Sequence, residues 1–302
     1  MNDRRHILWG LLGGIMLTGM TACSGDDDAT TPADDGVKTR HLTITQTDDN
    51  TTTRATLTEG DGLSAKWTAG DNLTYCNLSR TKNGDGITPY SGQLTAGSTA
   101  VVSQFTGDVT CYKGDYLAVV YPATTFTTNT FYTLSLTGQD GTLSTLATSY
   151  HYVFGKAQVT AVTDNTADAT IGKMKSLLTV CKFSFVNKEG GAAIPIKSLS
   201  ISYGGKGSDA GIYPQMATVS IGAYTAQADV HATGVEGSTG PLTVTCTTAQ
   251  ETVYVALLPT AAARTFQFTV TDGSGNTYSG TAKATLTEGE YIEATGLKLT
   301  KQ

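Results

Sequence analysis

The chain has 302 residues, of which 15% are charged, and a formal net charge of −6. This length is enough for two domains of ordinary size. The sequence has no basic stripe that could neutralise phosphates, which argues against a nucleic-acid partner. Its 34 Gly residues, abundant Thr and scarcity of helix formers at 3.6-residue spacing favour an all-β fold.

The first 22 residues have the composition of a signal peptide. Arg4, Arg5 and His6 form a short basic start, and residues 7–22 carry no charge. That apolar run is shorter than the roughly 20 residues that a membrane-spanning helix needs. Since small residues precede its end, we expect residues 1–22 to be removed during export, which leaves 280 residues.

The residues around the cut predict a lipid anchor. Met20-Thr21-Ala22-Cys23 resembles a lipobox, at which a lipid (palmitate) is joined to the Cys thiol, although Met20 replaces the usual Leu. The alternative is an ordinary signal peptide followed by an unrelated Cys. Ser24, Gly25, Asp26, Asp27 and Asp28 follow and resemble the acidic tag of surface-exported lipoproteins of the Bacteroidales. A solvated acidic tether is the alternative interpretation of these five residues.

The next part of the chain changes from a tether to strands. Residues 23–40 are rich in Asp, Thr and Ala, so we expect an acidic flexible tether. Residues 41–47 then predict a strand with Leu42 and Ile44 on one face, before a polar loop at 48–54. Further strands are predicted at 55–57, 63–67, 73–76, 93–94, 100–105, 116–121, 130–137 and 157–160, with one short helix near 143–150.

The chain turns polar again over residues 164–169, and we place a domain boundary there, between 171 and 172. Residues 177–186 predict a central strand with Cys181, Phe183 and Phe185 on one face. Later strands are predicted at 196–203, 213–219, 242–247, 251–258, 265–271, 278–286 and 291–299. Short strands between turn signals are typical of β-sandwiches, so we predict one sandwich over residues 41–171 and a second over 172–302.

Four cysteines remain besides Cys23: Cys76, Cys111, Cys181 and Cys246. They form no CxxC pair, and His is too sparse to complete a zinc site, so we expect no metal. Because export takes the chain through an oxidising compartment, a Cys76–Cys111 or a Cys181–Cys246 disulfide is one alternative. The apolar face that carries Cys181 favours buried free thiols instead.

Catalytic constellations are not found in the sequence. His41, His151 and His231 lie far apart with no carboxylate at ligand spacing, and no Gly-x-Ser-x-Gly elbow occurs. The stretch at residues 204–208 lacks the spacing of a phosphate-binding loop. We therefore expect neither enzymatic activity nor a cofactor.

Several phrases follow one another in a recognisable order. They are Trp67-Thr-Ala-Gly70-Asp71-Asn-Leu73, Phe105-Thr-Gly107, Tyr116-Leu-Ala-Val-Val-Tyr121-Pro122, Leu177–Val186, Tyr254–Pro259, Phe266-Gln-Phe268 and Gly289-Glu-Tyr291. In this order the phrases resemble the fimbrillin family, the type V pilins and their accessory subunits. The resemblance runs from about residue 41 to residue 299. It implies two tandem transthyretin-like β-sandwich domains.

The resemblance also implies assembly by donor-strand exchange. In such pilins a lipoprotein precursor keeps its first strand in the N-terminal sheet until a surface protease with Arg specificity releases it. The open groove then accepts a strand from a neighbouring subunit, often its C-terminal segment. The implied partners are other fimbrial subunits, the protease and the outer membrane, where the anchored chain is exposed at the cell surface.

On this chain, residues 41–47 would be the displaceable strand, with Leu42 and Ile44 filling the groove. Arg54 is the candidate cleavage site, because it ends a Thr-rich loop and precedes a small residue. Arg40 is the runner-up, although a cut there would leave the strand in place. A solvated loop residue is the alternative interpretation of Arg54.

At the other end of the chain, Leu297 and Leu299 alternate with polar residues as in a donor strand, or belong to an ordinary last strand of their own domain. The function expected is therefore a structural or adhesive subunit of a cell-surface fimbria. The alternatives are a non-polymerising surface lipoprotein that binds a glycan or host protein, and an uncleaved anchor or tip subunit.

Overall fold

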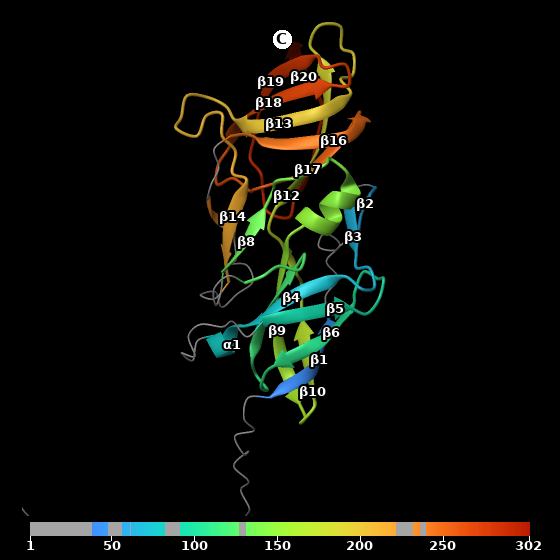
Figure 1. The fold of residues 1–302 in the computed structure, drawn as a ribbon, viewed down its shortest axis with the longest axis vertical. Helices are drawn as coiled ribbons and strands as arrows, with labels where there is room; N and C mark the ends of the chain where they lie inside the picture. Colours follow the sequence, from blue (N-terminus) through green and yellow to red (C-terminus); the bar gives the residue numbers. More distant parts are fainter. Residues whose placement is uncertain are drawn as a thin grey trace, which may run out of the picture. The chain divides into compact units, whose positions relative to one another are not determined.

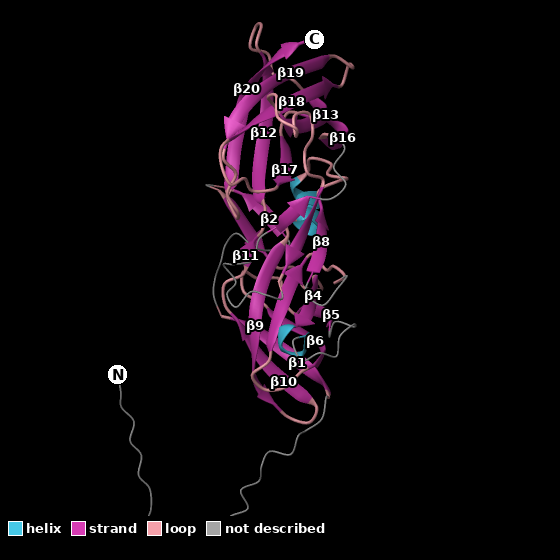
Figure 2. Cartoon of the chain, turned by 90° about the vertical axis from the view of Figure 1, so that its left-hand side faces the viewer, coloured by secondary structure: helices cyan, strands magenta, loops and turns pink. Residues whose placement is uncertain are grey.

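The computed structural model describes residues 38–47, 56–60, 62–81, 91–126, 131–221, 232–235 and 240–302. All of them belong to one compact unit, Val37–Gln302. Strands dominate this part of the chain (Figure 1, Figure 2). Its helical segments are short: α1 (Leu78–Thr81), α2 (Leu143–Thr145) and a π-helical turn, η1 (Leu146–Tyr150). The all-β fold and the short helix near residue 143 are thereby confirmed.

The first sheet closes on itself. Its order is β10-β1-β6-β5-β4-β7-β9-β11, and an additional pairing of β10 with β9 completes a ring. The apolar side chains inside it include Leu73, Leu94 and Phe105. Closure leaves the strands of the ring without the unpaired edges of an open sheet, while β11 lies outside the ring and pairs with β9. The strands are β1 (Thr39–Gln46), β4 (Asn72–Asn77), β5 (Ser91–Ala96), β6 (Gln104–Thr110), β7 (Tyr116–Tyr121), β9 (Val153–Val162), β10 (Thr166–Ile171) and β11 (Lys175–Ser176).

The second sheet has the order β16-β13-β18-β19-β20-β12-β17. Its strands are β12 (Thr179–Asn187), β13 (Ile196–Tyr203), β16 (Leu242–Gln250), β17 (Val253–Leu257), β18 (Arg264–Asp272), β19 (Thr277–Ala284) and β20 (Tyr291–Lys301). The predicted central strand is β12, and its Cys181, Phe183 and Phe185 are buried as expected. Phe268 packs against both phenylalanines, with ring centroids 5.3 and 5.7 Å away. Together the two large sheets confirm the predicted pair of β-sandwiches, each barrel-like.

Two smaller sheets accompany the large ones, and in one of them strands from both sides of position 171 pair. β8 (Phe131–Ser135) pairs with β14 (Met216–Ser220), which also pairs with β15 (Ala232–Val235). The hairpin of β2 (Thr56–Glu59) and β3 (Leu63–Lys66) contributes Leu57 to the same apolar core as Leu257. This core, the second core of the molecule, therefore receives side chains from before residue 171 as well as after it. The domain boundary between residues 171 and 172 stays a prediction.

β10 lies where the sequence suggested a polar segment. It runs parallel to β1 and antiparallel to β9, and it buries Ala167, Ala169 and Ile171. Small Ala side chains give a weak apolar alternation, which polar neighbours conceal in the sequence. The strand forms because β1 and β9 offer it backbone partners along both edges, which no pattern within residues 166–171 reveals.

Candidate strand-exchange site

β1 presents one row of side chains to the interior of the first sheet. Arg40, Leu42, Ile44 and Gln46 are buried, and the side chains between them point outward, as the two-residue period of a strand requires. β1 pairs antiparallel with β6 and parallel with β10 (Figure 1). Leu42 and Ile44 are 0% exposed. β1 therefore fills a slot between two strands and supplies part of the core.

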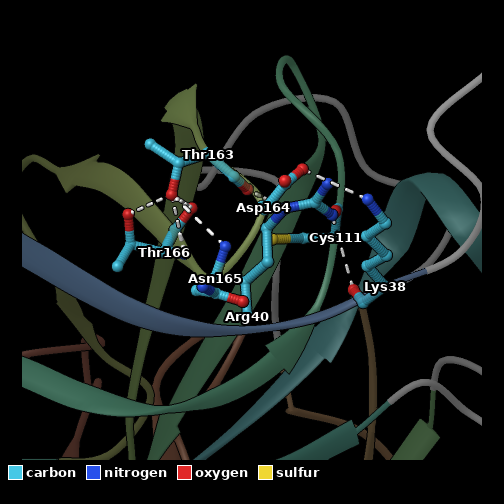
Figure 3. A network of polar contacts seen from close by, with 7 residues as sticks. All are labelled: Lys38, Arg40, Cys111, Thr163, Asp164, Asn165 and Thr166. Carbon is cyan, nitrogen blue, oxygen red and sulfur yellow. Dashed lines mark hydrogen bonds and ion pairs between the residues drawn. The ribbon is translucent and has the colours of Figure 1, made fainter. Parts of the chain in front are cut away.

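A buried arginine secures the beginning of β1. The Arg40 side chain is only 1% exposed. Its Nε donates a hydrogen bond to the Thr163 carbonyl oxygen at 2.7 Å, and its Nη1 donates to the Cys111 carbonyl oxygen at 2.6 Å (Figure 3). The guanidinium can hold two separate carbonyls because its donors form a fixed, planar fork. Arg40 thereby links β1 to the residues that directly follow β6 and β9.

The turn that receives Arg40 is itself ordered by polar contacts. Thr163 and Thr166 hydroxyls lie 2.6 Å apart, and the Thr166 backbone N–H donates to the Thr163 hydroxyl at 3.0 Å (Figure 3). Lys38 Nζ lies 3.2 Å from the Asp164 carboxylate, with both side chains exposed. An exposed pair of this kind contributes little to stability, typically below about 1 kcal/mol. The buried Arg40 contacts are the stronger tie.

A second polar contact secures the end of β1. The indole Nε1 of Trp67 donates to Gln46 Oε1 at 3.0 Å, and both side chains are buried. Trp67 is in turn positioned by edge-on contacts with Phe105 and Tyr121, whose ring centroids lie 4.9 and 5.5 Å away. On the inward face of β1, Leu42 and Ile44 therefore lie between two residues with buried hydrogen bonds, Arg40 and Gln46.

Several predicted site residues lie outside the described residues. They are Cys23, Ser24, Gly25, Asp26, Asp27, Asp28 and Arg54. Arg40, the runner-up cleavage site, is described and buried, so a protease could reach it only after β1 leaves the sheet. The connection that contains Arg54 runs from β1 to β2, so a cut there would separate β1 covalently from the strands that follow.

The C-terminal strand is an interior strand in this structure. β20 lies between β19 and β12, antiparallel to the first and parallel to the second. Leu299 is 1% exposed and Leu297 is half-buried. This is the arrangement of an ordinary last strand within its own chain. A donor role for these two leucines stays a prediction, and it requires β20 to leave the sheet.

Glu59 at the end of β2 holds the hairpin against the second sheet. Its carboxylate forms an ion pair with Lys182 of β12 and accepts hydrogen bonds from the hydroxyls of Tyr254 and Tyr291. The hydrogen bond from Lys182, reinforced by the one from Tyr254, lowers the pKa of Glu59 to about 2. Glu59 therefore stays ionised at neutral pH. This contact fixes the chain a few residues beyond Arg54.

The structure describes all four cysteines that follow Cys23, together with His41 and His151. Cys76, Cys111, Cys181 and Cys246 are buried and form no disulfide, in agreement with the favoured alternative. Burial raises the pKa of the Cys181 thiol to about 12. His151 is buried, exposed His41 lies 3.2 Å from Asp108, and His231 falls outside the described residues. Among the described residues, no three His, Cys, Asp or Glu side chains cluster as metal ligands. No described helix is long and apolar enough to cross a membrane.

A separate groove lies beside the ends of β13 and β18. Its volume is about 480 Å³, and its walls include Tyr203, Pro214 and Pro259. Arg264 lies over the Tyr203 ring at 4.2 Å from the centroid and forms an ion pair with Asp209. The volume falls in the range of roughly 300–1,000 Å³ that is common for small-molecule sites.

Comparison with known proteins places the fold. No protein-family model and no curated protein matches the sequence. A candidate cell adhesion protein from Bacteroides ovatus superposes with a TM-score of 0.54 at 12% identity, over 88% of this chain and 96% of the other. One from Bacteroides uniformis gives a TM-score of 0.52 at 15% identity, over 87% and 96%. The chain shares the fold of these two proteins.

A pilin structure matches less well than these two. A shaft pilin from Lactobacillus rhamnosus is covered over 98% of its length by 88% of this chain, at 11% identity and a TM-score of 0.35. The two Bacteroides matches are consistent with the resemblance of the sequence phrases to fimbrillins. At such identities they establish a shared fold, and the roles of individual residues depend on the geometry described above.

The hydrogen bonds that Arg40 and Gln46 form within the site are not evident from the sequence. Gln46 lies just after the apolar pair, and its partner Trp67 is distant in sequence. An arginine beside a charged tether normally predicts exposure, so the sequence presents Arg40 only as a cleavage site. One signal was available: Arg40 and Gln46 continue the alternation of Leu42 and Ile44, which places all four on one face.

Proposed function

We propose that the chain is a subunit of a cell-surface fimbria whose β1 is an exchangeable strand. The observation that carries this proposal is the position of β1, which closes the first sheet between β6 and β10 and buries Leu42 and Ile44. Because β1 is the first described strand, its release leaves the rest of the chain continuous. A released β1 would leave a slot with two rows of backbone partners and an apolar floor, which fits strand addition.

In this proposal Cys23 is an acylated anchor at the outer membrane, residues 24–28 direct export to the surface, and Arg54 is the cleavage site. Arg54 is preferred to Arg40 for a physical reason. The Arg40 side chain is buried and hydrogen-bonded within the sheet, whereas proteases cut extended, accessible chain. Cleavage after Arg54 also leaves the hairpin attached, since Glu59 remains bonded to the second sheet.

The test is cleavage of the purified precursor with an Arg-specific protease, followed by mass spectrometry, gel electrophoresis and electron microscopy. We expect a cut after Arg54, loss of the fragment that carries β1, and filaments or a ladder of oligomers. Arg54→Lys is the matched control, because it keeps the charge and removes the cleavage site. If the protein is cut, loses β1 and stays monomeric, the proposal that it is a polymerising subunit is wrong.

The donor strand can be tested separately. A synthetic peptide of residues 291–302 is added to the cleaved protein, and a peptide with Asp in place of Leu297 and Leu299 serves as the control. Binding of the first peptide alone supports the C-terminal segment as donor. Equal binding of both, or of neither, assigns the donor role to another segment.

The groove beside Tyr203 supports a second candidate, a non-polymerising surface lipoprotein or an uncleaved anchor or tip subunit that binds a glycan. Its carboxylate and guanidinium can exchange hydrogen bonds with sugar hydroxyls, and its apolar walls can contact a sugar ring. Calorimetry with neutral hexoses, on the wild type and Asp209→Ala, tests this role. Binding that Asp209→Ala abolishes, in a chain that the protease leaves intact, would favour this candidate.

A further inference from the structure

The outer edge of β17 is covered by a loop from the first half of the chain. The inner edge of β17 pairs with β12. On the outer edge, the Tyr254 N–H donates to the Gly141 carbonyl oxygen at 2.9 Å, and the Ala256 N–H donates to Gln139 Oε1 at 2.8 Å. These are alternate N–H groups of one strand, the set that a further strand would bind.

Gln139 takes the place of a strand residue. Its side-chain amide is buried, accepts from the Ala256 N–H, and donates from Nε2 to the Ala256 carbonyl oxygen at 3.1 Å. A residue on a neighbouring antiparallel strand would form the same pair of bonds. The backbone carbonyl of Gln139 also accepts from the Thr245 N–H of β16 at 3.1 Å. Gln139 therefore bonds to both end strands of the second sheet.

The covering loop is shaped for this position. Gly141 has φ +79°, and a Cβ there would lie 2.8 Å from Val253 Cγ1, so a side chain would push the loop off β17. Asp140 accepts from the Thr142 N–H at 2.8 Å and from the Thr145 hydroxyl at 2.7 Å, which ties the loop to α2. The loop has its own internal supports besides its contacts with β17.

The covered strand has the composition of a self-pairing segment. Residues 253–258 read Val-Tyr-Val-Ala-Leu-Leu, with no charge and no Pro. Short segments of this kind pair with copies of themselves when an edge is open. Two copies of one edge can meet antiparallel about a two-fold axis, because the same surface is used on both sides.

We propose that residues 136–142 form an internal plug over a strand-acceptor edge on β17. The partner that this edge would otherwise bind is the same edge of a second copy. The plug thereby prevents a second copy of the chain from pairing with β17. This inference involves neither β1 nor the cleavage at Arg54, so it stands or falls independently of the proposed function.

The test uses uncleaved protein and Gln139→Ala, with Gln158→Ala as the matched control, because Gln158 is exposed on β9. Light scattering after size exclusion should give dimers for Gln139→Ala at concentrations where the wild type and the control are monomeric. Hydrogen exchange at Tyr254 and Ala256 should be at least about tenfold faster in the dilute variant. A folded Gln139→Ala that is monomeric with unchanged exchange would overturn the proposal.

Two further measurements keep the outcome decisive. Adding Ala256→Pro to Gln139→Ala removes the outer N–H that pairing requires, so the dimers should disappear; dimers that persist would contradict the assigned edge. If Gln139→Ala does not fold, exchange in the wild type decides. The Tyr254 and Ala256 amides should exchange faster than those of Val255 and Leu257, which face β12, and equal rates would refute a separable plug.

Discussion

Arg40 illustrates how a charged side chain can become part of a sheet interior. The side chain belongs to the inward row of β1, and its guanidinium donates to the carbonyl oxygens of Thr163 and Cys111, which directly follow β9 and β6. Burying a charge is costly unless hydrogen bonds replace water. Those bonds exist only while β1 is in place, so they favour the closed sheet over any state in which β1 has left.

Replacing Arg40 should therefore loosen β1. Arg40→Met keeps the length of the side chain but leaves the Thr163 and Cys111 carbonyl oxygens without its donors. We expect a loss of about 1–3 kcal/mol in the free energy of unfolding, measured by urea denaturation. Lys38→Ala, which removes an exposed cation two residues away, should cost less than about 1 kcal/mol. Equal effects of the two variants would contradict a special role for Arg40.

Glu59 gives a prediction that depends on pH. Its pKa is lowered to about 2 in the folded chain, from an ordinary value of 4.5, so its ionised form stabilises the fold. That stabilisation is complete above about pH 4.5 and is lost as the pH falls through about 2. The difference in unfolding free energy between wild type and Glu59→Gln should shrink over this range. Glu189→Gln, at an exposed turn, controls for the loss of one negative charge.

At the scale of the element, the β5–β6 contact depends on a glycine. Gly107 lies opposite Leu42 in the register of β1 and β6, and a Cβ there would be 2.4 Å from the Gln93 carbonyl oxygen. Gly107→Ala should separate β5 from β6 and cost about 1–3 kcal/mol, seen as a lower Tm. Gly97→Ala is the matched control, because a Cβ there would lie 3.5 Å from its nearest neighbour, the Gln104 carbonyl oxygen. A Tm loss in Gly97→Ala as large as that in Gly107→Ala would argue against the steric explanation.

The apolar residues of β1 should set how long it stays bound after cleavage. Leu42→Ala removes a fully buried side chain, which typically costs about 2–5 kcal/mol. After a cut at Arg54, the fragment that carries β1 should dissociate at least about tenfold faster in this variant, measured by native mass spectrometry over time. Thr45→Ala alters only the exposed face and should leave the rate nearly unchanged. A dissociation rate that Leu42→Ala leaves unchanged would show that this side chain does not hold β1 in the slot.

For the whole molecule, the cysteines report on both cores. Cys76, Cys181 and Cys246 belong to the second core and Cys111 belongs to the first. All four are buried. Protein that starts after Cys23 should therefore be unreactive toward an aromatic disulfide reagent at neutral pH and expose four thiols in denaturant. A thiol that reacts in the native protein would reveal local opening, and its position, read by mass spectrometry, would locate it.

Much of the fold, and less of the candidate site, can be predicted from the sequence. Strong alternation over residues 41–47 and 177–186 predicted β1 and β12, because apolar and polar residues differ clearly there. The alternation of β10 rests on alanines and was missed. At the site, the apolar pair of β1 was predicted, while its ties to Trp67, Thr163 and Cys111 were not, since each joins residues 21 or more positions apart.

By itself, the sequence determined the all-β class and the inward face of β1, because both depend on side-chain periods that are local in the chain. It also supplied the expectation of an export signal and lipid anchor, which stays a prediction. Only the tertiary structure decided that β1 closes a ring, that β20 is an interior strand and that Gln139 covers β17. The reason is that pairing depends on which distant strand offers free N–H and carbonyl groups, and this is settled only when the sheets assemble.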